Sequence, residues 1–506
     1  MTTQNPFFNV QQLVPGADSC LPEQPNLIFI ITDQERYPMY WPAGWAEAHL
    51  PQRERLANTG LSFSRAFCNS AMCSPSRATL FTGVYPAEHG VTETLTHGGI
   101  YSDQEGVLPT EMPNLADLLK SAGYQVFYKG KWHLSKPVNG EQWSAADGEH
   151  MAQAYGFEGW EADDAGGTVE EGDFGAGHTG KSGMGWDEDY TRQAERFLQT
   201  VDLSQPFALI ISLVNPHDVV AYPKSYVEGG FDSAEFAHLG IDLPPTVNED
   251  LSDKPTIHQR MGRGLNMRLG RLKTEAQQRA YVNFYAYLHK LTDEKIGRLI
   301  DALESRQVAP HLSLRDTSLI VRLSDHGELG MSHGGLRQKA FNAYEETMRV
   351  PLVFSNPHLY PEAATTDALA SLIDLMPTLA TITGANSHIS HFKGTDLTPI
   401  LSDPTASVQD AIHFTYDDQR AAAPNLPSAG RQPNHIRCIR TPQWKYAFYF
   451  DPRGKRATEY ELYDLLNDPL EAHNLAHQPA YQQKRKALHD RLVAIMEQNR
   501  TTPTRF

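Results

Sequence analysis

The run Asn26-Leu27-Ile28-Phe29-Ile30-Ile31-Thr32-Asp33 is the stretch from which the fold of this 506-residue chain can be inferred. It is continuously apolar up to Thr32, rich in β-branched side chains, and preceded by Pro25. Such a run is typical of a strand that is buried on both faces of a parallel sheet. Residues 207–214 and 318–323 have the same character. We therefore predict an α/β fold with a mostly parallel central sheet flanked by helices.

Polar side chains follow each of these three runs. Asp33 ends the first, His217 follows the second, and Asp325 and His326 follow the third. Open α/β sheets bind ligands at the carboxyl ends of their strands, so these side chains are expected at one edge. Carboxylate oxygens with an imidazole nitrogen form a ligand set for a divalent cation. Taken alone, Asp33 is better explained as a helix cap or a turn residue.

A second informative stretch is Cys73-Ser74-Pro75-Ser76-Arg77-Ala78-Thr79-Leu80-Phe81-Thr82-Gly83. Pro75 and Ser76 are typical of a helix start and Gly83 of a helix end, so a loop running into a helix is predicted. The N–H groups at such a start attract an anion, and Arg77 can neutralise one with its fork of donors. Two interpretations remain open here. Cys73 is a reactive side chain in an oxyanion pocket, or it is a buried structural cysteine beside a helix cap.

Further cationic and imidazole side chains occur later in the chain. In Gly130-Lys131-Trp132-His133-Leu134, a strand-like backbone would turn Lys131 and His133 to the same side. Both donate hydrogen bonds to an oxyanion when they are protonated. An ordinary surface lysine is the alternative for Lys131. His217 is a candidate proton donor to a leaving group, and Lys339 follows a pair of glycines in a later loop.

Together, these strings resemble the type I, formylglycine-dependent sulfatases of the alkaline phosphatase superfamily. The stretch from Cys73 matches the family signature Cys-x-Pro-Ser-Arg followed by Thr-Gly, and the other strings follow in the family's order over nearly the whole chain. The resemblance implies a catalytic domain at residues 1–401 and a C-terminal subdomain at residues 402–506 with a small antiparallel sheet and a closing helix. It implies catalytic roles for Cys73, Arg77, Lys131, His133, His217 and Lys339. It implies metal ligands at Asp33, Gln34, Cys73, Asp325 and His326.

The resemblance also implies a mechanism. In this family a maturing enzyme oxidises the cysteine to formylglycine, so Cys73 would become an aldehyde. The hydrated aldehyde has two hydroxyl groups on one carbon, of which one attacks the ester and the other then expels the oxyanion by reforming the aldehyde. The cationic groups would neutralise the equatorial oxygens, and His217 would protonate the departing oxygen. A serine or an unmodified cysteine lacks this exit.

The pairs Asp33-Gln34 and Asp325-His326 depart from the pattern of many sulfatases and resemble the branch with choline sulfatases and phosphonate monoester hydrolases. Compared with those sulfatases, this ligand set has one carboxylate fewer and one nitrogen more, which favours Mn²⁺ over Ca²⁺. Ca²⁺ remains an alternative. Three functions follow. The first is hydrolysis of aryl or alkyl sulfate monoesters, the second is hydrolysis of phosphonate monoesters or phosphodiesters, and the third is anion binding by a protein whose Cys73 is never converted.

The composition limits the partners. The formal net charge of −17 argues against nucleic acid or an anionic membrane, because both attract basic surfaces. The four cysteines (Cys20, Cys68, Cys73 and Cys438) are too few for a disulfide framework in so long a chain. Residues 1–26 lack a signal-peptide pattern, and no apolar stretch is long enough to span a bilayer. We expect a cytoplasmic homodimer that acts on a small anionic ester.

Overall fold

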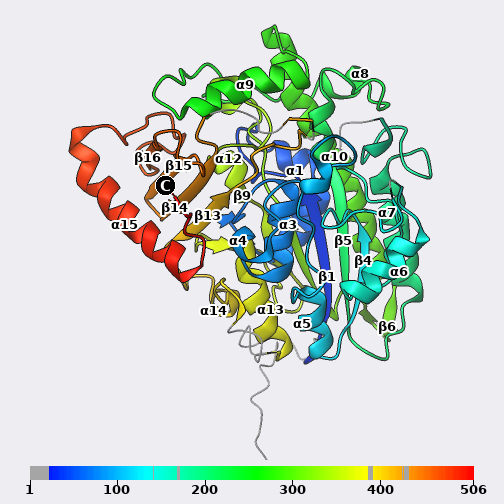
Figure 1. Ribbon diagram of the computed structural model, residues 1–506. Coiled ribbons are helices and arrows are strands. Elements are labelled where there is room, and N and C mark those ends of the chain that lie inside the picture. The colour runs from blue at the N-terminus through cyan, green and yellow to red at the C-terminus, as the bar shows by residue number, and fades with distance from the viewer. Residues whose placement is uncertain are drawn as a thin grey trace, which may run out of the picture.

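A computed structural model describes residues 22–140, 142–167, 171–385, 391–423, 425–426 and 432–505. Its centre is a seven-stranded sheet in the order β11-β2-β10-β8-β1-β5-β4 (Figure 1). The strands are β1 (Asn26–Asp33), β2 (Gly60–Phe63), β4 (Gln125–Gly130), β5 (Phe207–Pro216), β8 (Ser318–Ser324), β10 (Leu352–Ser355) and β11 (Ala364–Thr366). β1 pairs in parallel with both β5 and β8, whereas β10 runs antiparallel to its two neighbours. The predicted α/β fold with a mostly parallel sheet is confirmed.

The side chains of β1 divide between two hydrophobic layers. Leu27, Phe29 and Ile31 pack with α3 (Cys73–Thr82), α5 (Leu115–Ser121) and α13 (Leu375–Thr383). Ile28 and Ile30 pack with α7 (Trp186–Thr200) and α10 (Glu275–Ser305) on the other face. Successive side chains of a strand point to opposite faces, so an unbroken apolar run needs helices on both. This is why the sheet is the middle layer of three.

Shorter elements connect and cover this framework. In the described part of the chain, the other α-helices before the C-terminal sheet are α1 (Trp45–His49), α2 (Pro51–Asn58), α4 (Pro86–His89), α6 (Ala145–Ala154), α8 (Ser233–Phe236), α9 (Thr256–Arg268), α11 (Ser332–Gly335), α12 (Glu345–Met348) and α14 (Thr398–Ser402). Two small sheets are formed by β3 (Ala66–Phe67), β9 (Arg349–Val350) and β12 (Ala370–Ser371), and by β6 (Gln307–Ala309) and β7 (Leu312–Ser313). Among the described residues, no helix is both long and apolar enough to cross a membrane.

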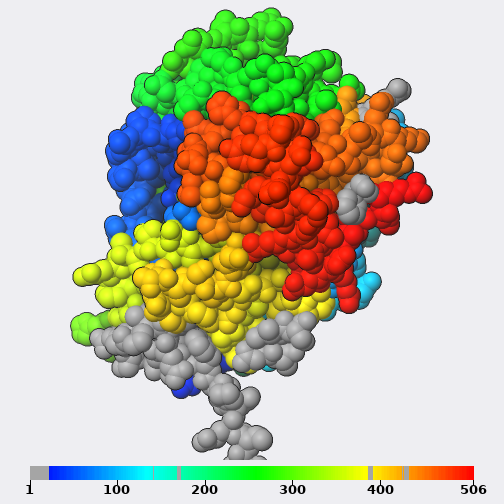
Figure 2. Space-filling view, turned by 90° about the vertical axis from the view of Figure 1, so that its left-hand side faces the viewer, coloured from blue at the N-terminus to red at the C-terminus, as the bar shows by residue number. Residues whose placement is uncertain are grey.

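A four-stranded antiparallel sheet follows, as predicted for the C-terminal part. It consists of β13 (Ile412–Tyr416), β14 (His435–Arg440), β15 (Trp444–Phe450) and β16 (Glu459–Asp464), in that order. One face joins the main hydrophobic core, and the other packs against α15 (Gln482–Gln498). Figure 2 shows this orange and red part of the chain seated against the green and yellow segments. The domain boundary between residues 401 and 402 stays a prediction.

One local expectation from the sequence needs correction. Gly60 begins β2 close behind α2, and an added Cβ there would lie 2.6 Å from the carbonyl oxygen of Leu56. The backbone after β4 is not strand-like, because His133 has a φ of 58°. Lys131 and His133 are both buried nonetheless. Cys20 lies outside the described residues, and the other three cysteines are free and buried.

Candidate active site

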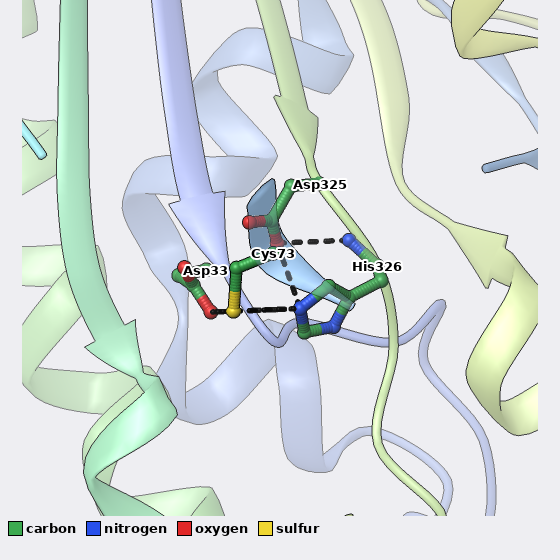
Figure 3. Close-up of side chains that lie close together, drawn as sticks. All are labelled: Asp33, Cys73, Asp325 and His326. Carbon is green, nitrogen blue, oxygen red and sulfur yellow. Dashed lines mark hydrogen bonds and ion pairs between the residues drawn. The ribbon is translucent and has the colours of Figure 1, made fainter. Parts of the chain in front are cut away.

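Four buried side chains meet at the carboxyl ends of β1 and β8 (Figure 3). They are Asp33, Cys73, Asp325 and His326, and their ligand atoms all lie within 4.8 Å of one another. The Cys73 Sγ is 3.5 Å from Asp33 Oδ1 and 3.2 Å from His326 Nε2. The structure thus brings together four of the five residues for which a metal-binding role is predicted.

Strand register explains why these residues meet. β1 and β8 are adjacent, with Thr32 opposite Ser324, so the next residue of each strand leaves the sheet at the same edge. The Asp325 N–H donates to the Thr32 carbonyl oxygen at 3.2 Å, which ties the two strand ends together. Helix α3 begins at Cys73 and is buried along its whole length, so it presents this side chain at a fixed point close to both carboxylates.

Arg77, one turn into α3, holds the two carboxylates in place. Its Nε donates to Asp325 Oδ2 at 2.9 Å and its Nη2 donates to Asp33 Oδ2 at 3.0 Å. Its Nη1 donates to the Lys131 carbonyl oxygen and to Ser212 Oγ. The guanidinium is fully buried, and its fork of donors is committed to these partners. Arg77 therefore contacts the candidate metal ligands directly.

The two carboxylates respond differently to burial. Burial alone would raise the pKa of Asp33, but Lys131, His217 and Arg77 together hold that pKa well below its ordinary value. Burial and the nearby Asp33 raise the pKa of Asp325 to about 6. Two carboxylates packed this closely repel each other, and a bound divalent cation would relieve that repulsion. The donor set therefore fits a metal ion.

The histidine in this group is held in the form that ligates metals. His326 Nδ1 lies 3.0 Å from the Gly327 carbonyl oxygen, which can only accept, so Nδ1 carries the proton. Burial lowers the pKa of His326, which favours the neutral ring. The Nε2 lone pair then points towards Cys73 and the aspartates. A backbone partner on one ring nitrogen is the usual way in which proteins orient a metal-binding histidine.

Gln34 and Lys339 form a neighbouring polar contact. The Lys339 Nζ donates to Gln34 Oε1, and Gln34 Nε2 donates to Glu328 Oε2 at 2.5 Å. Lys339 is 2% exposed and makes no ion pair with any carboxylate in the described part of the chain. Its positive charge is thus available for an anion. The predicted ligation of a metal by Gln34 stays a prediction.

The other predicted catalytic side chains surround the same point. The Lys131 Nζ is 2.7 Å from Asp33 Oδ2 and donates to the Gly166 carbonyl oxygen at 2.5 Å. His133 Nε2 donates to the Leu95 carbonyl oxygen at 2.8 Å, and its buried Nδ1 has no hydrogen-bond partner among the residues that the structure describes. An unpaired buried nitrogen of this kind favours a ligand that satisfies it.

A pocket opens above Cys73. Its lining includes Cys73, His133, His217 and Lys339, so four predicted catalytic residues share one solvent-reachable space. Burial, followed by the charges of Lys131 and Lys339, holds the pKa of His217 well below its ordinary value. A larger cavity of about 540 Å³ lies at the amino ends of the central strands, and none of these residues lines it.

The thiol of Cys73 is not an activated nucleophile as it stands. Burial and the negative charge of Asp33 raise its pKa, which keeps the sulfur protonated. Cysteine hydrolases instead rely on a thiolate whose pKa is lowered by neighbouring positive charge. The arrangement therefore does not support chemistry by an unmodified cysteine.

Some contributors were not predicted from the sequence. Ser212 accepts a hydrogen bond from Arg77, and its only sequence signal is a polar residue inside the apolar run of β5. Gly166 offers only a carbonyl oxygen to Lys131, which no sequence pattern reveals. Arg268, from α9, lines the pocket and belongs to none of the motifs identified in the sequence.

The chain is similar to several known proteins in sequence and in fold. An N-acetylglucosamine-6-O-sulfatase from Bacteroides thetaiotaomicron is 25% identical over 94% of this chain and 87% of its own length. A structure solved in complex with its substrate D-glucosamine-2-N,6-O-disulfate has a TM-score of 0.68 and 22% identity, covering 95% of this chain and 99% of that one. A phosphonate monoester hydrolase from Silicibacter pomeroyi has a TM-score of 0.67 and 20% identity, covering 95% and 96%.

These solved structures share the fold, which is that of the alkaline phosphatase-like sulfatases. Two family matches cover most of the chain. Residues 333–498 match the C-terminal region of N-sulphoglucosamine sulphohydrolase, which spans the late loops and the C-terminal sheet. Residues 25–385 match the Sulfatase family and include every residue of the site described above. The chain therefore belongs to the sulfatase family.

Proposed function

We propose that this sulfuric ester hydrolase acts through a formylglycine made from Cys73 and a divalent cation bound by Asp33, Gln34, Asp325 and His326. One observation carries the proposal. A buried, unactivated thiol lies within ligand distance of two carboxylates and a neutral imidazole, at the floor of a pocket whose lysine, Lys339, forms no ion pair with any described carboxylate. Oxidation of the thiol to the aldehyde, followed by hydration, gives position 73 two hydroxyl groups in place of the sulfur. The hydrated aldehyde supplies the attacking hydroxyl and a second hydroxyl for release of sulfate.

The chain's own residues have distinct tasks in this scheme. A bound cation lowers the pKa of a hydroxyl group that it ligates. Arg77 keeps both aspartates aimed at the cation, so its role is positional. Lys131 neutralises Asp33 on the other side. Lys339 faces the pocket and neutralises the oxygens of the ester sulfate, whose charge is largest in the transition state. Burial and Lys131 hold the pKa of His133 well below its ordinary value, so its Nδ1 donates to a sulfate oxygen only when the bound anion favours protonation of the ring.

His217 is proposed to protonate the departing oxygen. In the free site its ring is neutral, because burial and the neighbouring lysines disfavour a further positive charge. The negative charge of a bound sulfate ester offsets those lysines and favours protonation of the ring. The proton then passes to the leaving-group oxygen as the bond to sulfur breaks, with the bonding electron pair remaining on that oxygen.

The substrate and the environment follow from the same proposal. Sulfated sugars and small sulfate esters are the substrates named for relatives, and the phosphonate monoester hydrolase fold supports activity on phosphonate esters as the alternative. Mn²⁺ is the proposed metal, because one ligand is an imidazole nitrogen, and Ca²⁺ is the alternative. A sulfatase-maturing enzyme is the implied partner. The homodimer and the cytoplasmic address remain predictions.

Mass spectrometry of the peptide around Cys73 tests the proposed nucleophile. Protein made in a host that converts this signature should carry an aldehyde at position 73 and hydrolyse 4-nitrophenyl sulfate. Cys73→Ala should abolish turnover while the fold persists. Cys68→Ala is the matched control, because Cys68 is also a buried cysteine and contacts the Thr347 carbonyl oxygen instead of the site. Full activity of Cys73→Ala would contradict the mechanism, and an intact thiol with anion binding alone would favour a binding protein.

Metal analysis tests the ligand set. Asp325 is one of the two carboxylates in the group of four side chains around Cys73. Asp325→Asn removes its charge and keeps the size and shape of the side chain. We expect bound Mn²⁺ or Ca²⁺, measured after dialysis by elemental analysis, to fall from one equivalent to a small fraction of one. Unchanged metal content would remove Asp325 from the ligand set. A substrate panel of sulfate, phosphate and phosphonate monoesters then ranks the two hydrolase activities by kcat/KM.

A further inference from the structure

A basic segment lies beside the active-site pocket of this acidic protein. The whole chain has a net charge of −17, yet residues 256–273 contain no aspartate or glutamate. They contain five basic residues, which are Arg260, Arg263, Arg268, Arg271 and Lys273. Positive charge gathered at the mouth of a cleft in a negative protein attracts anionic ligands to that cleft.

Helix α9 forms most of this segment and lies beyond the carboxyl ends of the central strands (Figure 1). Leu265, Arg268 and Leu269, at its C-terminal end, line the same pocket as Cys73 and Lys339. The basic segment therefore borders the space where the part of the substrate that does not react must lie.

Arg268 is held in position by the loop that follows β13. Its Nη1 donates to the Ala421 carbonyl oxygen at 3.0 Å, and its Nη2 donates to the Ala422 carbonyl oxygen. Both alanines also line the pocket and have positive φ angles of 48° and 56°. Asp418 stabilises this unusual backbone by accepting from the Ala421 N–H at 2.7 Å. The guanidinium thus has a defined place at the pocket wall.

The charge of Arg268 is only partly offset by its surroundings. Asp418 is near enough to attract it electrostatically, but Arg268 forms no ion pair with a carboxylate among the described residues, and its side chain is exposed to solvent. Arg420, in the same loop, is paired instead with Glu93. A guanidinium has five N–H donors, so Arg268 keeps donors free after its two contacts with the loop. These free donors can bind a carboxylate or a sulfate in the planar, two-point manner that arginine favours.

We propose that Arg268 is a specificity-determining residue that binds a second anionic group on the non-reacting part of the substrate. The pocket then has two cationic points, with Lys339 at its floor for the ester sulfate and Arg268 at its wall for a further carboxylate or sulfate. The substrate class is sulfate esters that carry another acid group on the same scaffold. This inference rests on the proposed function of the site.

Matched pairs of esters test the proposal. The measured quantity is the ratio of KM for the methyl ester to KM for the carboxylate, which would not change if Arg268 only held the loop. The probes are 3- and 4-carboxyphenyl sulfate, their uncharged methyl esters, and 1,3- and 1,4-phenylene disulfate. For the enzyme with formylglycine in place, we expect KM for the better carboxylate isomer to be about tenfold lower than for its methyl ester. Arg268→Gln keeps donors for the loop carbonyls but removes the charge, so it should bring that ratio close to one. Arg268→Lys, which keeps the charge, should restore part of the preference.

Arg271→Gln is the matched control, because Arg271 belongs to the same basic segment but does not line the pocket. It should leave the wild-type ratio in place. Equal KM values for all carboxylates and methyl esters with the wild-type enzyme would overturn the proposal. An equal rise in KM for the carboxylate and for its methyl ester in Arg268→Gln would also overturn it, because that result is expected if the arginine only holds the loop. The two disulfates separate a preference for sulfate from one for carboxylate.

The test also separates failure of the inference from failure of the proposed function. If the wild-type protein turned over none of the esters, the proposed hydrolysis would fail. Calorimetric binding of each carboxylate and its methyl ester to wild-type protein and Arg268→Gln would still decide the second point. Tighter binding of the carboxylate by the wild type alone supports the subsite, and equal binding by both proteins overturns it.

Discussion

Arg77 shows how one residue organises the site. Its guanidinium contacts both aspartates at 2.9–3.0 Å and also reaches the backbone after β4 and a side chain of β5. A residue with a planar fork of donors can span two carboxylates, whereas the single ammonium group of lysine acts as a point charge. The prediction from the sequence was that Arg77 neutralises the substrate. Its contacts support a positioning role, which the next prediction tests.

Arg77→Lys should lower the affinity for the metal ion while the protein stays folded. Lysine keeps the positive charge that the buried carboxylates need but cannot hold both in place. Loss of a residue that orients metal ligands typically costs about 10- to 100-fold in metal affinity. Metal titration of the apo-protein measures this change. Arg55→Lys is the control, because Arg55 pairs with Asp301 and Glu304 on the surface. Equal metal affinity in Arg77→Lys and wild type would contradict the positioning role.

Among the elements, α10 braces the loops that follow β1 and β8. Tyr285 donates to the Gln34 carbonyl oxygen at 2.6 Å, and Tyr281 donates to Glu328 Oε1 at 2.8 Å. The two tyrosines are one helical turn apart, so they lie on the same face of the helix. Both are fully buried or nearly so. One helix therefore contacts two loops that are about 290 residues apart in sequence and holds them at a fixed spacing.

The short helix α11 contains a buried histidine with a pH-dependent role. His333 lies with Nδ1 2.9 Å from Glu249 Oε2 and Nε2 3.3 Å from Glu346 Oε2, and its ring stacks on Tyr344. Burial alone would lower the pKa of His333, but Glu346 and Glu249 raise it to about 9. Both ring nitrogens face acceptors, so the charged form is the one that these contacts stabilise.

The stability contributed by His333 should therefore disappear at alkaline pH. A folded-state pKa above the unfolded value of about 6.5 means that the contribution is complete below pH 6.5 and is lost as pH rises through about 9. Its size is on the order of 3 kcal/mol. Melting temperatures between pH 6 and 10 should fall more steeply for wild type than for His333→Gln. Parallel curves for the two proteins would show that His333 is not charged in the folded state.

At the scale of the whole molecule, buried ion pairs join the C-terminal sheet to the catalytic part. Glu345, in α12, lies 2.9 Å from Lys445 Nζ and 3.2 Å from Arg440 Nη2, and both partners belong to the C-terminal sheet. Lys445 also pairs with Glu471 at 2.7 Å. The C-terminal sheet is thus fixed against the loops that follow β8. Its β13 loop carries Ala421 and Ala422 into the pocket wall.

Lys445→Met should loosen this connection. The variant leaves Glu345 and Glu471 buried without their shared cation, and breaking a buried pair costs about 3–5 kcal/mol. We expect a fall in melting temperature together with a raised KM, because the pocket wall depends on the sheet. Lys486→Met is the control, since Lys486 forms an exposed pair with Asp490 in α15 and should cost about 0.5 kcal/mol or less. Similar melting temperatures for both variants would contradict the proposed connection.

Much of the architecture follows from local sequence. The unbroken apolar runs of β1, β5 and β8 predicted strands buried on both faces, because such runs gain stability only between two layers of helices. Residues 436–450 and 460–465 alternate in the way that is typical of antiparallel strands, and they contain most of β14, β15 and β16. Other elements were missed. Helix α6 lies in a stretch rich in glycine and acidic residues, although Ser144 and Asp147 form a capping box that marks its start.

By itself, the sequence determined the sheet, the family and the residues that end the strands, because hydrophobic period and short motifs are local properties of the chain. Only the tertiary structure decided which partners those residues take. Arg77 bonds to aspartates 44 and 248 residues away, and Arg268 meets a loop more than 150 residues further along the chain. Such contacts depend on the order of the strands in the central sheet and on how the C-terminal sheet packs against it. Both are determined by the burial of apolar side chains in the core that the two sheets share. The candidate catalytic residues can thus be read from the chain, but their geometry and the wall that selects the substrate arise from packing.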